Sequence, residues 1–257
     1  MTLTKEEQNR LLHGMLEMGD LLLNCGAEVS RVEDTLERMT RAYGAEHVEV
    51  FVITSIISMT LAFPDGEPIT ETRRIHSGGG TDFFRLEKLN ALSRECCIEP
   101  LPLPEMRQRL DKIAAGHKPF PAVFWGSVLT GGCFAVFFGG SVWDGLVAAA
   151  FGALICLMQV WLGRTKLNTV AFNLLVTLIT GLGVGFTTAV IPGLHMDTII
   201  MGDIMLLIPG LAITNAVRNM LVGDTISGVV RLLESLIWAA ALAGGFMVAL
   251  VIVGLLH

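Results

Sequence analysis

Apolar residues recur at intervals of three and four along the first 43 residues of the chain. This spacing predicts two amphipathic helices, over residues 5–24 and 27–43. A second face of the later helix carries four residues with polar or charged side chains: Glu28, Arg31, Thr35 and Arg38. Because Glu28 and Arg31 are three residues apart, they are close enough to form an ion pair on a helix.

The pattern then changes. Segments rich in β-branched residues, with alternation clearest in the first, predict three strands over 47–53, 56–63 and 69–75, with a turn at Pro64-Asp65-Gly66. Helical spacing returns over about 82–97 and 104–115. Residues 1–118 are therefore predicted to form an α+β domain.

Long apolar stretches dominate the rest of the chain. About 20 apolar residues are needed to cross the hydrocarbon core of a bilayer. Residues 119–257 contain five such stretches, at about 120–140, 142–162, 168–190, 198–220 and 232–256. The predicted fold is a polytopic α-helical membrane protein with five transmembrane helices behind an N-terminal cytoplasmic α+β domain.

Charge placement supports this division. Residues 1–118 hold 14 of the 18 Lys and Arg residues and 19 of the 24 Asp and Glu residues. The net charge of −6 argues against a nucleic-acid partner, which needs a basic surface. The five cysteines form neither a CxxC motif nor a Cys/His cluster, so neither a metal site nor a cofactor is predicted.

Topology follows from the positive-inside rule. The first residues are polar and lack the apolar segment of a signal peptide, which places the first domain in the cytoplasm. The loops then alternate, and Arg164, Lys166, Arg218 and Arg231 all fall on the inner side. An odd number of spans in the plasma (inner) membrane puts the C-terminus outside.

The fourth predicted span carries the strongest indication of function. Asp203 is ionisable within the apolar segment, Pro209-Gly210 interrupts the helix, and Asn215 and Asn219 share a face. Transporters build binding sites near the bilayer midplane from such broken, polar helices. The alternative is a kinked packing helix with polar residues at its interface.

Other polar residues flank this span. Asn173 and Thr177 lie on one face of the third span, where they either line a cavity or bond back to their own helix. Asp224, Arg231 and Glu234 follow the fourth span, and Arg231 and Glu234 either pair, gate the cytoplasmic entrance or extend to the interface.

The first domain offers weaker chemistry. Ser77-Gly-Gly-Gly-Thr81 lacks the Lys-Ser/Thr pair of a phosphate loop and is predicted to be a linker. Glu28 and Glu33 could serve as an acid/base pair, with Arg31 between them, in a membrane-anchored hydrolase; the simpler interpretation is a solvated helix face. A third hypothesis is a ligand sensor whose spans only anchor it.

Several segments resemble a known family. The segments that carry the resemblance are Gly26-Ala-Glu-Val-Ser-Arg-Val-Glu33, Thr81–Arg94, Leu207–Asn219, Gly223-Asp224 and Ser227–Arg231. Together they resemble the threonine/serine exporter family, including the membrane signature around Pro209-Gly210. One departure is Asn219, where the family pattern leads us to expect an acidic residue.

The resemblance implies export of small hydrophilic solutes, chiefly threonine and serine, driven by the proton motive force. It also implies a hetero-oligomer, because a chain with five spans is similar to the larger subunit of the two-subunit branch, which works with a small all-membrane partner. The chain is thus expected to be a transporter and not an enzyme. Asp203 is the expected proton or ammonium group, and Asn215, Arg218 and the Pro209-Gly210 break are expected to hold the substrate.

Overall fold

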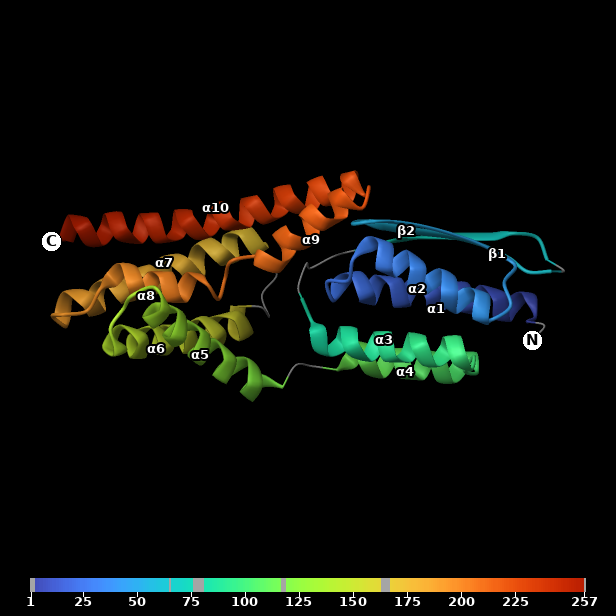
Figure 1. Ribbon diagram of the computed structural model, residues 1–257, viewed down its shortest axis with the longest axis horizontal. Helices are drawn as coiled ribbons and strands as arrows, with labels where there is room; N and C mark the ends of the chain where they lie inside the picture. Colours follow the sequence, from blue (N-terminus) through green and yellow to red (C-terminus); the bar gives the residue numbers. More distant parts are fainter. Residues whose placement is uncertain (1–2, 65, 76–80, 117–118, 163–166, 257) are drawn as a thin grey trace. The chain divides into compact units, whose positions relative to one another are not determined.

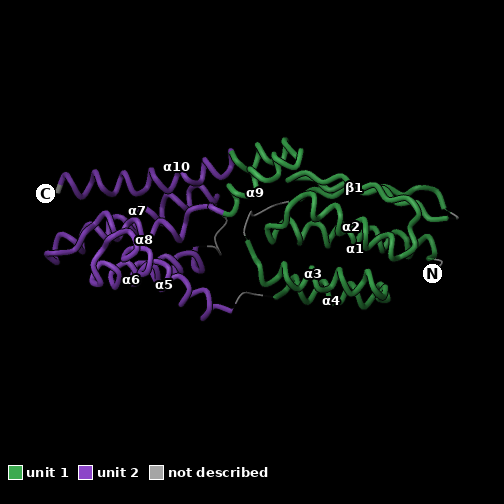
Figure 2. The backbone as a smooth tube through the Cα atoms, viewed as in Figure 1, with its two compact units in different colours: residues 1–117, 211–232 green, residues 118–210, 233–257 purple. Residues whose placement is uncertain are grey.

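The computed structural model describes residues 3–64, 66–75, 81–116, 119–162 and 167–256. It contains two compact units (Figure 2). Unit 1 comprises residues 1–117 and 211–232, and unit 2 comprises residues 118–210 and 233–257. The segment 211–232, predicted to belong with the membrane half, is therefore clustered with the first 117 residues.

Unit 1 contains every helix and strand predicted for the first domain. Helices α1 and α2 are followed by an antiparallel sheet of order β1-β2-β3 and by helices α3 and α4. The bounds are α1 Lys5–Asn24, α2 Val29–Ala42, β1 His47–Ile53, β2 Ile56–Ala62, β3 Ile69–Arg74, α3 Phe83–Ile98 and α4 Leu103–Ala115. The Ser77-Gly-Gly-Gly segment lies outside the described residues.

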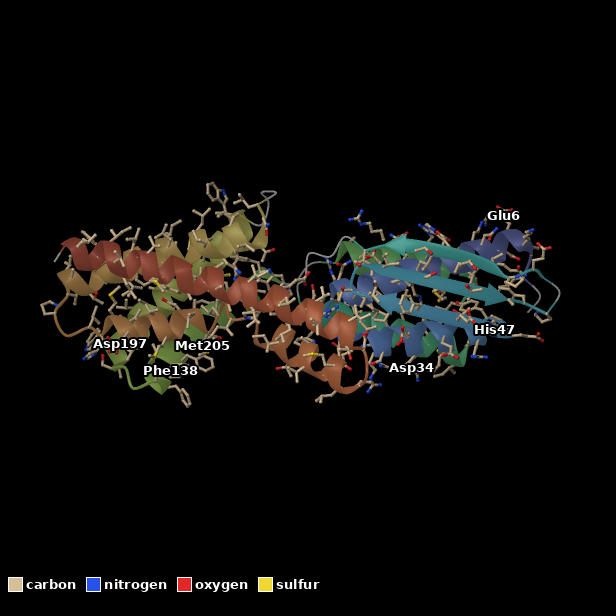
Figure 3. The ribbon with its side chains drawn as sticks, turned by 90° about the horizontal axis from the view of Figure 1, so that it is seen from above. Glu6, Asp34, His47, Phe138, Asp197 and Met205 are labelled. Carbon is tan, nitrogen blue, oxygen red and sulfur yellow. The ribbon has the colours of Figure 1, made fainter. Side chains whose placement is uncertain are left out.

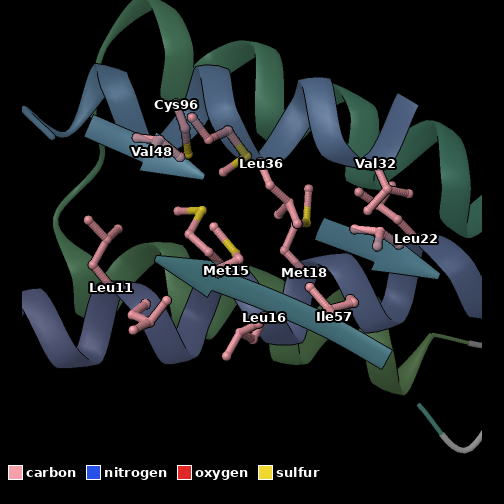
Figure 4. Packing of buried hydrophobic residues seen from close by; sticks show 14 of the residues in the cluster. Leu11, Met15, Leu16, Met18, Leu22, Val32, Leu36, Val48, Ile57 and Cys96 are labelled. Atoms are coloured by element: carbon pink, nitrogen blue, oxygen red, sulfur yellow. The ribbon is translucent and has the colours of Figure 1, made fainter. Parts of the chain in front are cut away.

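These elements form three layers: the sheet, the α1–α2 pair, and the α3–α4 pair (Figure 1). The apolar faces of α1 and α2 meet the inner face of the sheet, with Met15, Leu36 and Ile57 fully or nearly fully buried between them (Figure 4). The outward face of the sheet carries mostly polar side chains (Figure 3). On this face the hydroxyl groups of Thr60 and Thr70 are hydrogen-bonded at 2.9 Å. The predicted amphipathic periodicities thus correspond to the buried faces.

The α1–α2 corner depends on a glycine. Gly26 has φ = +90°, a conformation that residues with a side chain rarely adopt. The turn lets the Cys25 carbonyl accept a hydrogen bond from the Asp82 N–H at 3.0 Å, which joins this corner to the start of α3. A local backbone requirement therefore accounts for the glycine at the head of the 26–33 motif.

Four continuous helices are long and apolar enough to cross a membrane. They are α5 Phe120–Phe137, α6 Val142–Leu162, α7 Thr169–Val190 and α10, which runs Thr225–Leu256. Many large apolar side chains on them are exposed, among them Trp125, Trp143, Trp161 and Phe186. Such a surface is costly in water and normal in lipid, so the protein is a multi-pass helical membrane protein.

The predicted fourth span is not one continuous helix. Residues 196–221 form two helices, α8 Met196–Ile204 and α9 Gly210–Leu221. Helix α8 belongs to unit 2, and α9 belongs to unit 1 from Leu211 onward. The interruption lies at the predicted place. Pro209 has no N–H to donate and disfavours the helical conformation of the residue before it, so α9 begins only at Gly210.

A second boundary differs as well. Residues 218–231 were expected to form a loop, but Arg218 lies in α9 and Arg231 in α10, which begins seven residues before the predicted residue 232. Only residues 222–224 connect the two helices, because Gly223, at φ = +99°, permits a tight turn. Arg164 and Lys166 lie outside the described residues, so the predicted topology stays a prediction.

Candidate functional site

Asp203 is fully buried near the end of α8 in unit 2. Among the described residues, neither of its carboxylate oxygens has a hydrogen-bond partner. Helix α8 packs closely on α5 at Gly202. A Cβ atom on this residue would lie only 2.5 Å from the Gly131 carbonyl oxygen, so a larger residue would not fit without a shift. A Cβ on Gly131 would lie 3.2 Å from Asp203 Oδ1, so the carboxylate faces α5 at a point where there is no side chain.

This arrangement is unusual for a helix bundle. An ionisable group within an apolar bundle costs several kcal/mol unless it is paired or reached by water, and such residues mark ion or substrate pathways by default. Among the described residues no group of three His, Cys, Asp or Glu side chains could hold a metal ion near it. A carboxylate in such surroundings has the chemistry to accept a proton or to attract a cation.

The polar face of α7 is buried but makes no hydrogen bond to Asp203. Asn173 and Thr177 are both buried, and the Thr177 hydroxyl donates to the Asn173 carbonyl at 2.8 Å. A Cβ on Gly245 of α10 would lie 2.0 Å from Thr177 Oγ1, so this threonine faces a neighbouring helix. For Thr177, the predicted alternative of bonding back to its own helix is what the structure contains.

A second group of predicted residues meets in unit 1. Glu28, at the start of α2, forms an ion pair with Arg218 of α9 at 2.5 Å, instead of with Arg31. The Glu28 side chain is only 16% exposed, whereas that of Arg218 is 54% exposed. Asn215, one turn earlier on α9, lines a cavity together with Glu28 and Arg31. Residues nearly 190 positions apart in the sequence therefore share one site.

Glu33 has a different role from Glu28. Its carboxylate accepts the Val52 N–H of β1 at 2.9 Å, and burial raises its pKa, with a further increase from the negative charge of Asp224. Because Glu28 pairs with α9 and Glu33 bonds to β1, no hydrogen bond joins the two carboxylates among the described residues. The predicted acid/base pair of a hydrolase has no support in this geometry.

The corner between α9 and α10 concentrates buried polar atoms. Asn219 Nδ2, Asp224 Oδ2 and Ser227 Oγ are all buried without a hydrogen-bond partner among the described residues. A Cβ on Gly228 would lie 2.8 Å from a carbonyl oxygen of α9, so the two helices cross closely there. Ser227 was not singled out from the sequence. Beyond this corner, Arg231 and Glu234 follow three residues apart on α10.

One polar contact in unit 2 was missed entirely. Asp144, at the start of α6, is fully buried. Its Oδ2 accepts the Ser141 N–H at 2.7 Å, and its Oδ1 accepts the His195 N–H at 2.7 Å. His195 Nδ1 lies 3.0 Å from Asp144 Oδ2. This hydrogen bond and the charge of Asp144 raise the pKa of His195. The sequence did contain a signal for part of this arrangement: Ser141 and Asp144 have the Ser-x-x-Asp spacing of a capping box at the start of a helix.

Known proteins resemble the chain over nearly its full length. Residues 13–253 match the family described as "Putative threonine/serine exporter". The chain is 26% identical over 268 residues to the "Probable succinate transporter subunit YjjP" of Klebsiella aerogenes, covering 99% of this chain and 98% of that protein.

Two further relatives agree. The protein of the same description from Escherichia coli K12 is 26% identical over 260 residues, with 97% of each chain covered. The "Probable threonine/serine exporter" of Mycobacterium tuberculosis is 22% identical over 250 residues, covering 94% of this chain but 46% of that longer protein. No solved structure matches the chain.

Proposed function

Because the chain belongs to the threonine/serine exporter family, we propose that it is a secondary active exporter of a small hydrophilic solute. The solute is threonine, serine or a related small carboxylate, and export is coupled to protons. The observation that carries this proposal is Asp203, a buried carboxylate in a bundle of apolar helices that has no hydrogen-bond partner among the described residues. A protein that only needed packing there would gain stability from an apolar side chain.

The interrupted α8–α9 segment supplies the second part of the proposal. Residues 205–209 are not helical. The N–H groups of Leu206, Leu207 and Ile208 bond back to Asp203 and Ile204, so we assign backbone carbonyl groups of this segment to the solute. We assign Asp203 to the proton or to a substrate ammonium group, and the Pro209-Gly210 break with Asn215 and Arg218 to the passage of the solute. Asn173, Thr177 and Asn219 remain proposed contacts.

The topology completes the proposal. The α8–α9 segment completes a fifth crossing of the inner membrane, which places residues 1–117 in the cytoplasm and the C-terminus outside. Five crossings make half of a transport unit, and two relatives are named as transporter subunits. The chain therefore works with a small all-membrane partner subunit in a hetero-oligomer, and Arg231 and Glu234 lie at its cytoplasmic mouth.

Efflux measurements test the role of Asp203. Cells that express the chain with its partner are loaded with threonine or succinate, and efflux is followed for the wild type, Asp203→Asn and Asp197→Asn. Asp197 is an exposed carboxylate on the first turn of the same helix, so it is a matched control. We expect Asp203→Asn to abolish proton-driven efflux and Asp197→Asn to retain it; unchanged efflux by Asp203→Asn would remove this carboxylate from the mechanism.

A further inference from the structure

Unit 1 contains a cavity of about 440 Å³ between α2, α3 and the start of α9. Its volume lies within the range of small-molecule sites, about 300–1,000 Å³. The lining includes apolar side chains, among them Leu22, Val32 and Leu86, together with polar and charged side chains. Every lining residue belongs to unit 1, so the cavity is a property of that unit alone.

The charge of this cavity is opposite to that of the chain. Arg31 and Arg38 of α2 and Arg94 of α3 line it, and Glu28 is the one acidic side chain among the described lining residues. Two charged residues outside the lining pair with lining residues: Asp34 with Arg38, and Arg218 with Glu28. The negative charge of Asp34 and the positive charge of Arg218 cancel. A local excess of two positive charges thus remains in a protein whose net charge is −6.

Two of the arginines are available to a ligand. Among the described residues, neither Arg31 nor Arg94 makes an ion pair or a hydrogen bond. They come from different helices that pack against each other, α2 and α3, so they approach the cavity from two sides. A guanidinium group binds a carboxylate through two parallel hydrogen bonds, so each of these arginines can hold one carboxylate.

The remaining polar groups favour an anion as well. The side-chain amides of Asn90 on α3 and Asn215 on α9 can each donate to an oxygen. The N-terminus of α2 lies at this cavity and adds a partial positive charge, and none of the described side chains caps it. Glu28, the one group that could attract an ammonium ion, is already paired with Arg218.

We propose that this cavity is a binding site for a small dicarboxylate, separate from the Asp203 carboxylate in unit 2. The two unpaired arginines match the two carboxylates, and the asparagine amides complete the set of donors. A zwitterionic amino acid offers one carboxylate and an ammonium group, which the excess positive charge repels. The site therefore favours a dianion such as succinate over threonine, and this holds whether or not the chain exports either solute.

Equilibrium binding to the full-length protein in nanodiscs tests this site. Radiolabelled succinate is the probe, and unlabelled succinate, threonine and inorganic phosphate compete with it. The variants are Arg31→Gln and Arg94→Gln. The matched control is Arg74→Gln, since Arg74 is an exposed arginine of unit 1 at the end of β3 that does not line the cavity.

We expect succinate to bind the wild type and Arg74→Gln alike, and each cavity variant at least tenfold more weakly. Threonine should compete at least tenfold less well than succinate. Unfolding midpoints equal to that of the wild type show that the variants are folded, as expected for exposed side chains. Succinate affinity unchanged in both cavity variants would overturn the site.

Two other results would overturn the ligand class. If threonine competed as well as succinate, the site would not select a dianion. If phosphate displaced succinate equally well, the cavity would be a general anion site without preference for a dicarboxylate. The Asp203→Asn protein separates this inference from the proposed export, because it should bind succinate normally even though its efflux is lost.

Discussion

The ion pair between Glu28 and Arg218 joins α9 to the start of α2, and its contribution to stability can be measured. The two charged atoms are 2.5 Å apart, which in a medium with the dielectric constant of water corresponds to an attraction of about 1.7 kcal/mol. The low exposure of Glu28 increases that attraction. The half-exposed Arg218 reduces the net gain, because holding its long side chain costs up to about 2 kcal/mol of rotamer entropy.

Double-mutant cycles on exposed ion pairs give about 0.2–1 kcal/mol, and because Glu28 is largely buried we expect a coupling energy at the upper end, about 1 kcal/mol. A double-mutant cycle isolates this energy, using Glu28→Gln, Arg218→Gln and the double variant. All four tryptophans lie in unit 2, so unfolding of the purified chain in detergent is followed by far-UV circular dichroism during denaturant titration, which gives the free energy of each variant. Since the pair is partly screened, raising the salt concentration should lower the coupling.

The Asp34–Arg38 pair provides the comparison. Its atoms are 2.6 Å apart, but both side chains are about half exposed and lie four residues apart on one helix, where such pairs contribute about 0.3–0.5 kcal/mol. We expect the Glu28–Arg218 coupling to be the larger of the two. Equal couplings, or a Glu28–Arg218 value near zero, would refute the argument that burial of Glu28 strengthens its contact with α9.

Two further predictions concern unit 2. Gly202→Ala places a methyl group 2.5 Å from the Gly131 carbonyl oxygen, so α8 must move away from α5. We expect the free energy of unfolding, measured by thermal unfolding, to fall by about 1–3 kcal/mol. An unchanged unfolding midpoint would contradict the close packing of α8 on α5. Because its pKa is raised in the folded protein, protonated His195 stabilises the fold fully below its ordinary pKa of about 6.5, and this stabilisation is lost as the pH rises through the folded pKa. Unfolding midpoints from pH 5.5 to 8.5 should therefore fall more for the wild type than for His195→Gln, and parallel curves would show that the contact with Asp144 does not depend on the charge of His195.

Much of the local structure followed from the sequence. Periods of three to four and of two residues predicted the helices and strands of residues 1–117, because burial of one face requires that spacing. The length of apolar stretches predicted the helices α5, α6, α7 and α10, and Pro209 predicted the interruption of the fourth span. The start of α10 was misplaced, because polar residues after Asp224 are as compatible with a helix as with a loop.

The sites depended on contacts that a local pattern does not contain. Helical spacing made Glu28 and Arg31 plausible partners, yet the tertiary structure brings Arg218 to Glu28. Arg31 lies beside a cavity and makes no ion pair with any residue that the structure describes. Asp144 had no role predicted from the sequence, and only the fold places His195 against it. The grouping of residues 211–232 with the first 117 likewise appears only when the chain is folded.

By itself, the sequence determined that this protein has a polar α+β part and an apolar helical part, and that one span carries an acidic residue and a break. These features depend on composition and on short-range spacing, which each segment carries alone. The tertiary structure decided which charges pair, which stay buried without a partner and which line a cavity. Such pairing depends on how distant helices pack, since two charges interact strongly only when folding brings them within a few ångströms of each other and excludes water.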